Sequence, residues 1–262
     1  MNNFVINNKK ELQKLSALAL FAGKTMLSNG AETYRVEDTM IRICNSKENV
    51  QEVDSFVTQT GIFLTLEYKG DVFTYFKRIK NVDINLNIIN LVNDFSRKFV
   101  NKNITLEQGM KDLEAINNVR GYPKYLKLFS GSYVSGFFSL MFGGTYQDFF
   151  ASFLASLLSL LILDKLSKYN LTFFIDRFLG AFLTSLFAYI TVKTGLGVHL
   201  DKIIIGSIMY LLPGVSITNS IRDTMSGDSL SGLSKGMEAI LSALAIAFGV
   251  GIVLNLKAKG LI

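Results

Sequence analysis

The sequence is short of the residue types on which many enzymes and metalloproteins depend. Its 262 residues include one cysteine and one histidine. A single cysteine, Cys44, excludes an internal disulfide and a cysteine metal cluster, and its place in a helical pattern predicts a small core residue. The lone histidine, His199, stands at the edge of a predicted loop, which favours a structural role over a catalytic or metal-binding one.

Several functional signatures are also missing. The sequence contains neither the phosphate-loop pattern GxxxxGK-S/T nor GxGxxG, and it offers no Ser-His-Asp, Cys-His or metal-ligand set. The basic residues behind its net charge of +6 are dispersed, which argues against nucleic acid as a partner. We therefore predict no catalytic residues, no metal, no cofactor and no enzymatic activity, and the missing phosphate loops argue against an ATP-driven process in this chain alone.

Charged and apolar residues are distributed unevenly along the chain. Residues 1–124 hold most of the lysine, arginine, aspartate and glutamate, whereas residues 125–258 contain long apolar runs with few charges. Two parts with different solvent preference are the simplest account of this division. We predict a soluble cytosolic α+β domain over residues 1–122, followed by a membrane α-helical bundle over residues 123–262, with Pro123 at the boundary.

The first domain is expected to combine helices with a small sheet. Amphipathic helices are predicted over residues 11–28, 33–46, 85–101 and 105–118. Residues 52–79 alternate between apolar and polar side chains and are rich in valine, phenylalanine, threonine and tyrosine. This pattern predicts two or three strands, with Lys69-Gly70-Asp71 as a hairpin turn. The chain starts with the polar sequence MNNFVINNKKELQKL, which does not resemble a signal peptide, so we expect this domain to begin in the cytosol.

The second part is expected to cross the membrane about five times. A spanning helix needs about 20 mostly apolar residues. Candidate spans are residues 125–142, 148–166, 171–192, 201–217 and 236–256. Arg120 and Lys124 precede the first span and Lys127 lies at its start, which places the N-terminal domain in the cytosol. With five spans, this orientation puts the C-terminus outside. Lys257 and Lys259, which follow the fifth span, conflict with it because basic residues favour the cytosolic side.

The fourth span is interrupted by Pro213-Gly214, and the segment that follows is dense in polar groups. Broken helices of this kind offer free backbone groups to ions and small anions. The segment contains Thr218, Asn219, Ser220, Arg222, Asp223, Ser226, Gly227 and Asp228. These residues have the groups to hold a zwitterion, with Arg222 facing a carboxylate and Asp223 or Asp228 facing an ammonium group. A polar cytosolic loop after a kinked span is the alternative.

Two further acidic residues lie near the ends of predicted spans. Asp176 stands beside Arg177 at the start of the third span, and it either lies at the cytosolic interface or lines a polar cavity. Glu238 opens the fifth span, where it either complements the helix dipole or carries a proton. Both are candidates for the substrate or ion path.

Long motifs in both parts of the chain resemble one family. NGAETYRVEDTM (29–40), FVTQTGIFLTL (56–66) and FKRI (76–79) occur in the first part, and PGVSITNSIRDTMSGDSLSGLSKGMEA (213–239) occurs in the second. In this order they resemble the threonine/serine exporter family over nearly the whole chain, as the first, longer half of a split two-subunit exporter. Family residues in the first motif are Asn29, Gly30, Ala31, Thr33, Arg35 and Glu37.

The resemblance implies a subunit of a secondary transporter that exports small polar carboxylate-bearing metabolites, threonine or serine in some members and succinate in others. It implies a multi-pass protein in the lipid bilayer of the cytoplasmic (plasma) membrane, working with a second, smaller membrane subunit and coupled by default to a proton gradient. The motif at residues 29–37 is expected to have a structural or docking role, and an oligomer is left open. A membrane-bound enzyme and a non-transporting anchor or receptor are the alternatives, which flux measurements in vesicles distinguish from a transporter.

Overall fold

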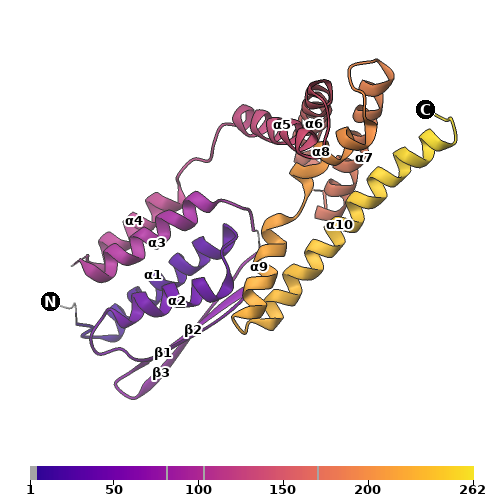
Figure 1. The fold of residues 1–262 in the computed structure, drawn as a ribbon. Helices are drawn as coiled ribbons and strands as arrows, with labels where there is room; N and C mark the ends of the chain where they lie inside the picture. Colours follow the sequence, from indigo (N-terminus) through magenta and orange to yellow (C-terminus); the bar gives the residue numbers. More distant parts are fainter. Residues whose placement is uncertain (1–4, 81, 103, 170) are drawn as a thin grey trace. The chain divides into compact units, whose positions relative to one another are not determined.

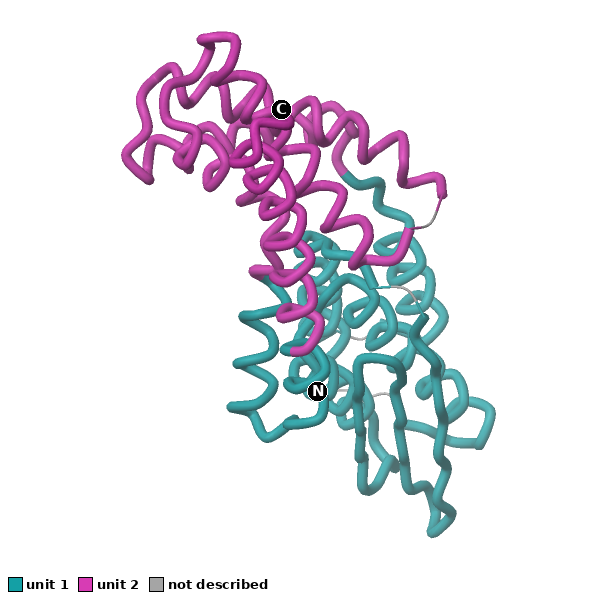
Figure 2. The backbone as a smooth tube through the Cα atoms, turned by 90° about the vertical axis from the view of Figure 1, so that its right-hand side faces the viewer, with its two compact units in different colours: residues 1–121, 215–236 teal, residues 122–214, 237–262 magenta. Residues whose placement is uncertain are grey.

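A computed structural model of the chain describes residues 5–80, 82–102, 104–169 and 171–262. The chain divides into two compact units (Figure 2). Unit 1 comprises Met1–Gly121 and Val215–Gly236, and unit 2 comprises Tyr122–Gly214 and Met237–Ile262. Unit 1 therefore takes in a segment of the second motif. The sequence predicted a soluble domain that ends at residue 122 and a membrane bundle that follows it. The two units are defined by contacts and not by solubility, so this division stays a prediction.

Unit 1 contains the helices and strands predicted for the first part of the sequence (Figure 1). In chain order these are α1 (Lys9–Ser28), α2 (Thr33–Asn45), β1 (Gln51–Thr58), β2 (Gly61–Tyr68), β3 (Asp71–Arg78), α3 (Leu86–Asn101) and α4 (Leu106–Asn117). Side-chain caps start several of the helices. Thr105, for example, accepts a hydrogen bond from the Gln108 N–H at the start of α4, as the sequence suggests.

The strands β1, β2 and β3 form an antiparallel sheet in that order. Lys69 and Gly70 join β2 to β3 with φ angles of 53° and 80°, the left-handed conformation that a two-residue hairpin turn requires. Side chains of β2 alternate between the two faces, so Ile62 and Leu64 are buried while Phe63 between them is exposed. One face of the sheet can therefore support a core.

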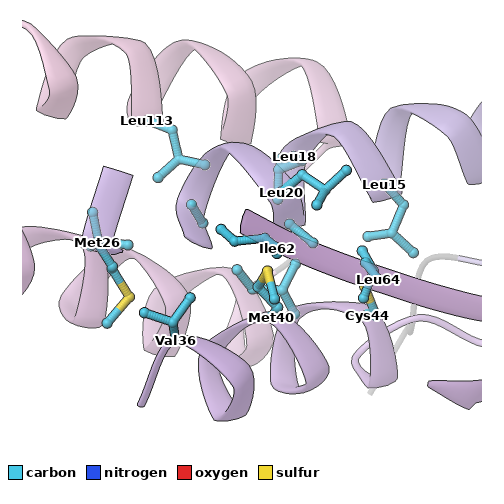
Figure 3. Close-up of a cluster of buried hydrophobic side chains, with 14 of the residues drawn as sticks. Leu15, Leu18, Leu20, Met26, Val36, Met40, Cys44, Ile62, Leu64 and Leu113 are labelled. Atoms are coloured by element: carbon cyan, nitrogen blue, oxygen red, sulfur yellow. The ribbon is translucent and has the colours of Figure 1, made fainter. Parts of the chain in front are cut away.

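The core of unit 1 joins this face to the helices. Side chains from α1, α2, α4 and β2 gather in one cluster, which includes Leu18, Met40, Ile62 and Leu113 (Figure 3). Burying each large apolar side chain contributes about 1.5–3 kcal/mol. Cys44 is buried in the same cluster, as predicted, and burial raises the pKa of its thiol to about 12. Val36 and Met40 anchor α2 in this core, and the start of the same helix takes part in the polar cluster described below.

Unit 2 is helical and packs through small residues. It contains α5 (Lys124–Met141), α6 (Tyr146–Leu166), α7 (Phe173–Lys193), α8 (Leu200–Ile208) and, from Met237 on, α10 (Ser229–Ala258). Serine, alanine and glycine dominate the buried faces of α5, α6 and α7. Gly206 of α8 approaches α5 so closely that a Cβ atom there would lie 2.6 Å from the Ser139 nitrogen. Close approach of this kind is typical of helix packing in membranes.

Within the described residues, three helices are long and apolar enough to cross a membrane: Tyr146–Tyr169, Phe173–Lys193 and Ser229–Ala258. A fourth span results if the bent pair Leu200–Leu211 and Gly214–Met225 is counted as one. The number is therefore three to four where the sequence predicted about five. When the bent pair is counted, the remaining difference is α5, which has 18 residues, includes Lys124 and Lys127 in its first turn, and contains several serines and glycines.

Candidate functional site: a polar cluster in unit 1

The two sequence motifs meet in unit 1. α9 (Gly214–Met225), which belongs to this unit from Val215 on, and Asp228 in the turn after it contact the loop after α1 and the start of α2. Thr33 and Asp223, which are hydrogen-bonded here, are 190 positions apart in the sequence. We call this set of contacts the polar cluster, and its charged members are Glu32, Arg35, Glu37, Arg222, Asp223, Asp228 and Lys235.

The turn after α1 presents a backbone carbonyl to α9. Gly30 has a φ angle of +88°, a conformation that favours glycine, and a Cβ atom there would lie 3.3 Å from the Asp83 carbonyl oxygen. The Asn29 side chain steadies the turn by donating to the Thr25 carbonyl at 2.7 Å. The Gly30 carbonyl then accepts a hydrogen bond from Asn219 Nδ2 at 2.9 Å. Asn219 is buried, and this bond satisfies part of its amide.

Two acids of the second motif cap a helix of the first. Within the residues that the structure describes, the N-cap residue of α2, Glu32, makes no side-chain bond to the helix N–H groups. Asp223 Oδ1 accepts the Thr33 N–H instead, at 3.1 Å, and Asp228 Oδ2 accepts from Thr33 Oγ1, also at 3.1 Å. Unpaired N–H groups and the helix dipole both favour a carboxylate at this position. The start of α2 therefore depends on α9 and the turn that follows it.

Glu32 pairs with two guanidinium groups. Its carboxylate is buried, with Arg222 Nη1 2.7 Å from Oε1 and Arg35 Nε 3.3 Å from Oε2. Burial alone would raise the pKa of Glu32, but its hydrogen bonds and the charges of Arg35 and Arg222 together lower it. The side chains of Arg35 and Arg222 are 38% and 53% exposed, so each remains accessible from solvent.

Asp223 lies at the centre of the polar cluster and is fully buried. Among the described residues, its second oxygen, Oδ2, has no hydrogen-bond partner. Lys235 of α10, which is also buried, interacts electrostatically with Asp223. A buried carboxylate is costly unless such a charge compensates it.

Glu37 lies beside the two acids of the second motif. Its Oε1 accepts a hydrogen bond from the Val57 N–H of β1 at 2.7 Å. Burial raises the pKa of Glu37 and the negative charges of Asp228 and Asp223 add to this effect, while the bond from Val57 opposes it. Glu37 therefore binds a proton more readily than an isolated glutamate does.

We expect Glu37→Gln to stabilise the protein at neutral pH. Because the folded-state pKa of Glu37 is raised above its ordinary value of 4.5, its contribution to stability is fully present below that value and is lost as the pH rises through the folded-state pKa. Glutamine keeps an acceptor for Val57 but carries no charge. The variant should therefore melt at a higher temperature than the parent at neutral pH, and the difference should shrink as the pH falls below the ordinary value.

Melting curves recorded across this pH range test the expectation. Glu114→Gln, at an exposed glutamate of α4, is the matched control and should leave the curves unchanged. A difference between Glu37→Gln and the parent that does not vary with pH would count against the role given to Glu37.

The remaining predicted residues lie outside the contacts just described. Three are exposed on α9 or in the turn after it: Thr218, Ser226 and Gly227. Pro213-Gly214 forms the break between η2 (Met209–Leu211) and α9. Asp176, in the first turn of α7, and Glu238, exposed on α10, belong to unit 2. Over the described parts of the chain, no group of three or more His, Cys, Asp or Glu residues is arranged to hold a metal ion.

Sequence reasoning left two charged members, Glu32 and Lys235, out of the candidate site. Glu32 forms an ion pair with Arg35 three residues further along the chain, and its side chain is buried. Both residues lie inside the two long motifs, and that position was the signal that pointed to them.

Unit 2 contains another buried carboxylate, Asp148. It accepts hydrogen bonds from the backbone N–H groups of Thr145, Val198 and His199 at 2.8–2.9 Å, and its Oδ2 lies 2.8 Å from His199 Nδ1. Thr145 and Asp148 also form the capping box that starts α6. These bonds tie two loops of unit 2 together, which accords with a structural role for the single histidine.

Apolar helices of spanning length, and an α+β unit in which the polar cluster holds α9, define a helical membrane protein with an appended α+β unit. The chain belongs to the threonine/serine exporter family, whose model matches residues 17–257. It is therefore a member of a family of transporters, which confirms the resemblance noted in the sequence.

Similar proteins cover the chain to different extents. It is 22% identical to a protein of Klebsiella aerogenes named probable succinate transporter subunit YjjP, over 97% of each chain. The protein of the same name in Escherichia coli is also 22% identical, over 96% of this chain and 97% of that one. The threonine/serine exporter of Corynebacterium glutamicum is 25% identical over 58% of this chain and 31% of its own length. No solved structure matches the chain.

Proposed function

We propose that this chain is one subunit of a secondary transporter that exports small polar metabolites carrying a carboxylate. The strongest support is the comparison between the length of this chain and the lengths of its relatives. The chain matches a protein named as a transporter subunit over 97% of both lengths, but it matches only 31% of the longer threonine/serine exporter. A chain of this size supplies one side of a site at the middle of the membrane, and a second, smaller membrane subunit supplies the other.

The proposal includes an orientation. The N-terminal domain, residues 1–122, is soluble and cytosolic, and the chain crosses the plasma membrane about five times, with α5 as the first crossing. The basic residues before α5 support this side for the domain. The proton gradient is the proposed energy source, with Glu37, whose pKa is raised by burial, as a carboxyl group able to respond to it.

The polar cluster is the proposed cytosolic end of the substrate path. Arg222 and Arg35 present half-exposed guanidinium groups beside Glu32, so a substrate carboxylate can replace the Glu32 carboxylate as the partner of Arg222. The two YjjP proteins, which match nearly the whole chain, are named as succinate transporter subunits, and this favours a dicarboxylate as the substrate. The Corynebacterium exporter, which matches part of the chain, is named for threonine and serine and favours an amino acid. Carboxylate recognition by Arg222 serves either substrate.

Reconstitution of the purified chain into vesicles, with and without the second subunit, tests the proposal. We expect efflux of radiolabelled succinate or serine only when both subunits are present, because the chain alone lacks half of the site. Empty vesicles give the background. Efflux by the chain alone would contradict the need for a second subunit, and no efflux of either compound from the pair would contradict the proposed substrate class.

A further inference from the structure

α9 is amphipathic in the opposite sense to an ordinary surface helix. Its polar residues Asn219 and Asp223 are buried, and both are hydrogen-bonded within unit 1. Ile217, Ile221 and Met225 are 47%, 55% and 82% exposed. A spacing of four residues places these three side chains on one line along the helix, which we call the apolar stripe.

This arrangement follows from the polar cluster. A surface helix normally buries its apolar side against the core and turns its polar side to water. In α9 the polar side is held by the Gly30 carbonyl and the start of α2, so the apolar stripe must face away from unit 1. Leu230 and Leu233, in the first turns of α10, are exposed as well. Unit 1 thus carries apolar side chains on both helices that join it to the rest of the chain.

The chain on either side of α9 indicates what covers the stripe. Leu200–Leu211 precedes α9 and, together with it, has the length and apolarity of a membrane span. α10 follows, and its residues up to Gly236 belong to unit 1. The rest of α10, residues 237–258, is about 33 Å long at 1.5 Å per residue, close to the hydrocarbon thickness of about 30 Å. α9 is therefore joined at both ends to helices of apolar sequence, which favours a location at the edge of the hydrocarbon.

We propose that α9 is an interfacial helix whose apolar stripe lies in the edge of the lipid bilayer while its polar side holds the start of α2. The partner of the stripe is the acyl-chain region of the membrane. α9 thereby fixes Arg222 and Asp223 next to the membrane surface. This inference goes beyond the proposed function, because it is independent of what is transported.

A single introduced tryptophan tests the location of the stripe. The parent chain contains no tryptophan, so the emission of Ile221→Trp or Met225→Trp comes from the introduced indole alone. We expect either variant, as full chain in phosphatidylcholine vesicles, to lose about half of its emission or more when the acyl chains are brominated, and to be shielded from iodide. Met225 is the most exposed position of the stripe, so its replacement keeps the test valid if Ile221→Trp fails to fold.

Two control positions define the extremes. Phe248→Trp, at an exposed residue of α10 within a candidate span, should be quenched by the brominated lipid. Val72→Trp, at an exposed residue of β3, should be quenched by iodide. A stripe tryptophan that behaves like the Val72 control would overturn the proposal. Shielding from both quenchers would also overturn it, since a second copy or another protein would then cover the stripe. The readout needs no transport, so its failure leaves the proposed function standing.

Discussion

Replacing Asp223 by alanine is expected to lower the free energy of unfolding of unit 1 by about 3–5 kcal/mol. Asp223 is fully buried, accepts the Thr33 N–H at the start of α2, and interacts with the buried Lys235. Its removal takes away one partner of a buried charge cluster, which costs more than the loss of an exposed ion pair because the remaining charges stay buried. The start of α2 also loses its cap.

Native-state hydrogen exchange is the appropriate measurement, because it resolves α2 and α9 within the full chain. Protection of both helices should fall in Asp223→Ala, with unit 2 unchanged. Asp94→Ala, at an exposed aspartate of α3 in the same unit, is the matched control and should stay within about 0.5 kcal/mol of the parent. Equal protection of α2 in the parent and in Asp223→Ala would show that α9 does not hold this helix.

The second large effect is expected on transport. Arg222→Gln should reduce apparent substrate affinity roughly tenfold or more, because one charge-assisted contact contributes about 1.5–3 kcal/mol. Arg222→Lys should recover only part of the loss, since lysine cannot form the paired contact of a guanidinium group with a carboxylate. Efflux measured against substrate concentration, at matched expression, gives the affinity directly.

Two further variants separate substrate binding from structural support. Glu32→Gln removes the charge that pairs with Arg222 inside unit 1 but leaves the guanidinium group in place. If Arg222 binds substrate, Glu32→Gln should transport better than Arg222→Gln; equal losses would mean that Arg222 serves only to hold Glu32. Arg42→Gln, at an exposed arginine paired with Asp38 along α2, should transport like the parent. Normal transport by Arg222→Gln would remove the site assignment and leave the family membership untouched.

The helices and strands of unit 1 could be predicted because their signals are local. Thr105 caps α4 and Lys69-Gly70 turns the hairpin through interactions within a few residues. The polar cluster could not be predicted in this way. Asn219 and Asp223 lie on one side of α9, and that pattern fits a side lining a polar path as well as one bound to another part of the protein. The choice depends on Gly30 and Thr33, which are about 190 positions away.

The number of membrane spans could be predicted less well than the elements of unit 1, because it also depends on what surrounds each helix. Apolar length predicts a crossing well when the helix contains a long apolar run, as α10 does after Glu238. α5 combines moderate apolarity with serine and glycine, which lets it pack closely against neighbouring helices but weakens the signal. α8 is apolar but has only 9 residues, too few for a crossing by itself. Burial against protein and exposure to lipid favour the same composition here, so sequence alone does not separate them.

Cys44 also determines how the chain behaves toward thiol reagents. The thiolate is the reacting form, and a buried thiol with a pKa of about 12 provides very little of it at neutral pH. The parent chain should therefore react very slowly with maleimides. A cysteine introduced at an exposed position such as Asn7 would then be the dominant site of labelling. Membrane-impermeant maleimides can thus map the side of each loop without prior removal of the natural cysteine.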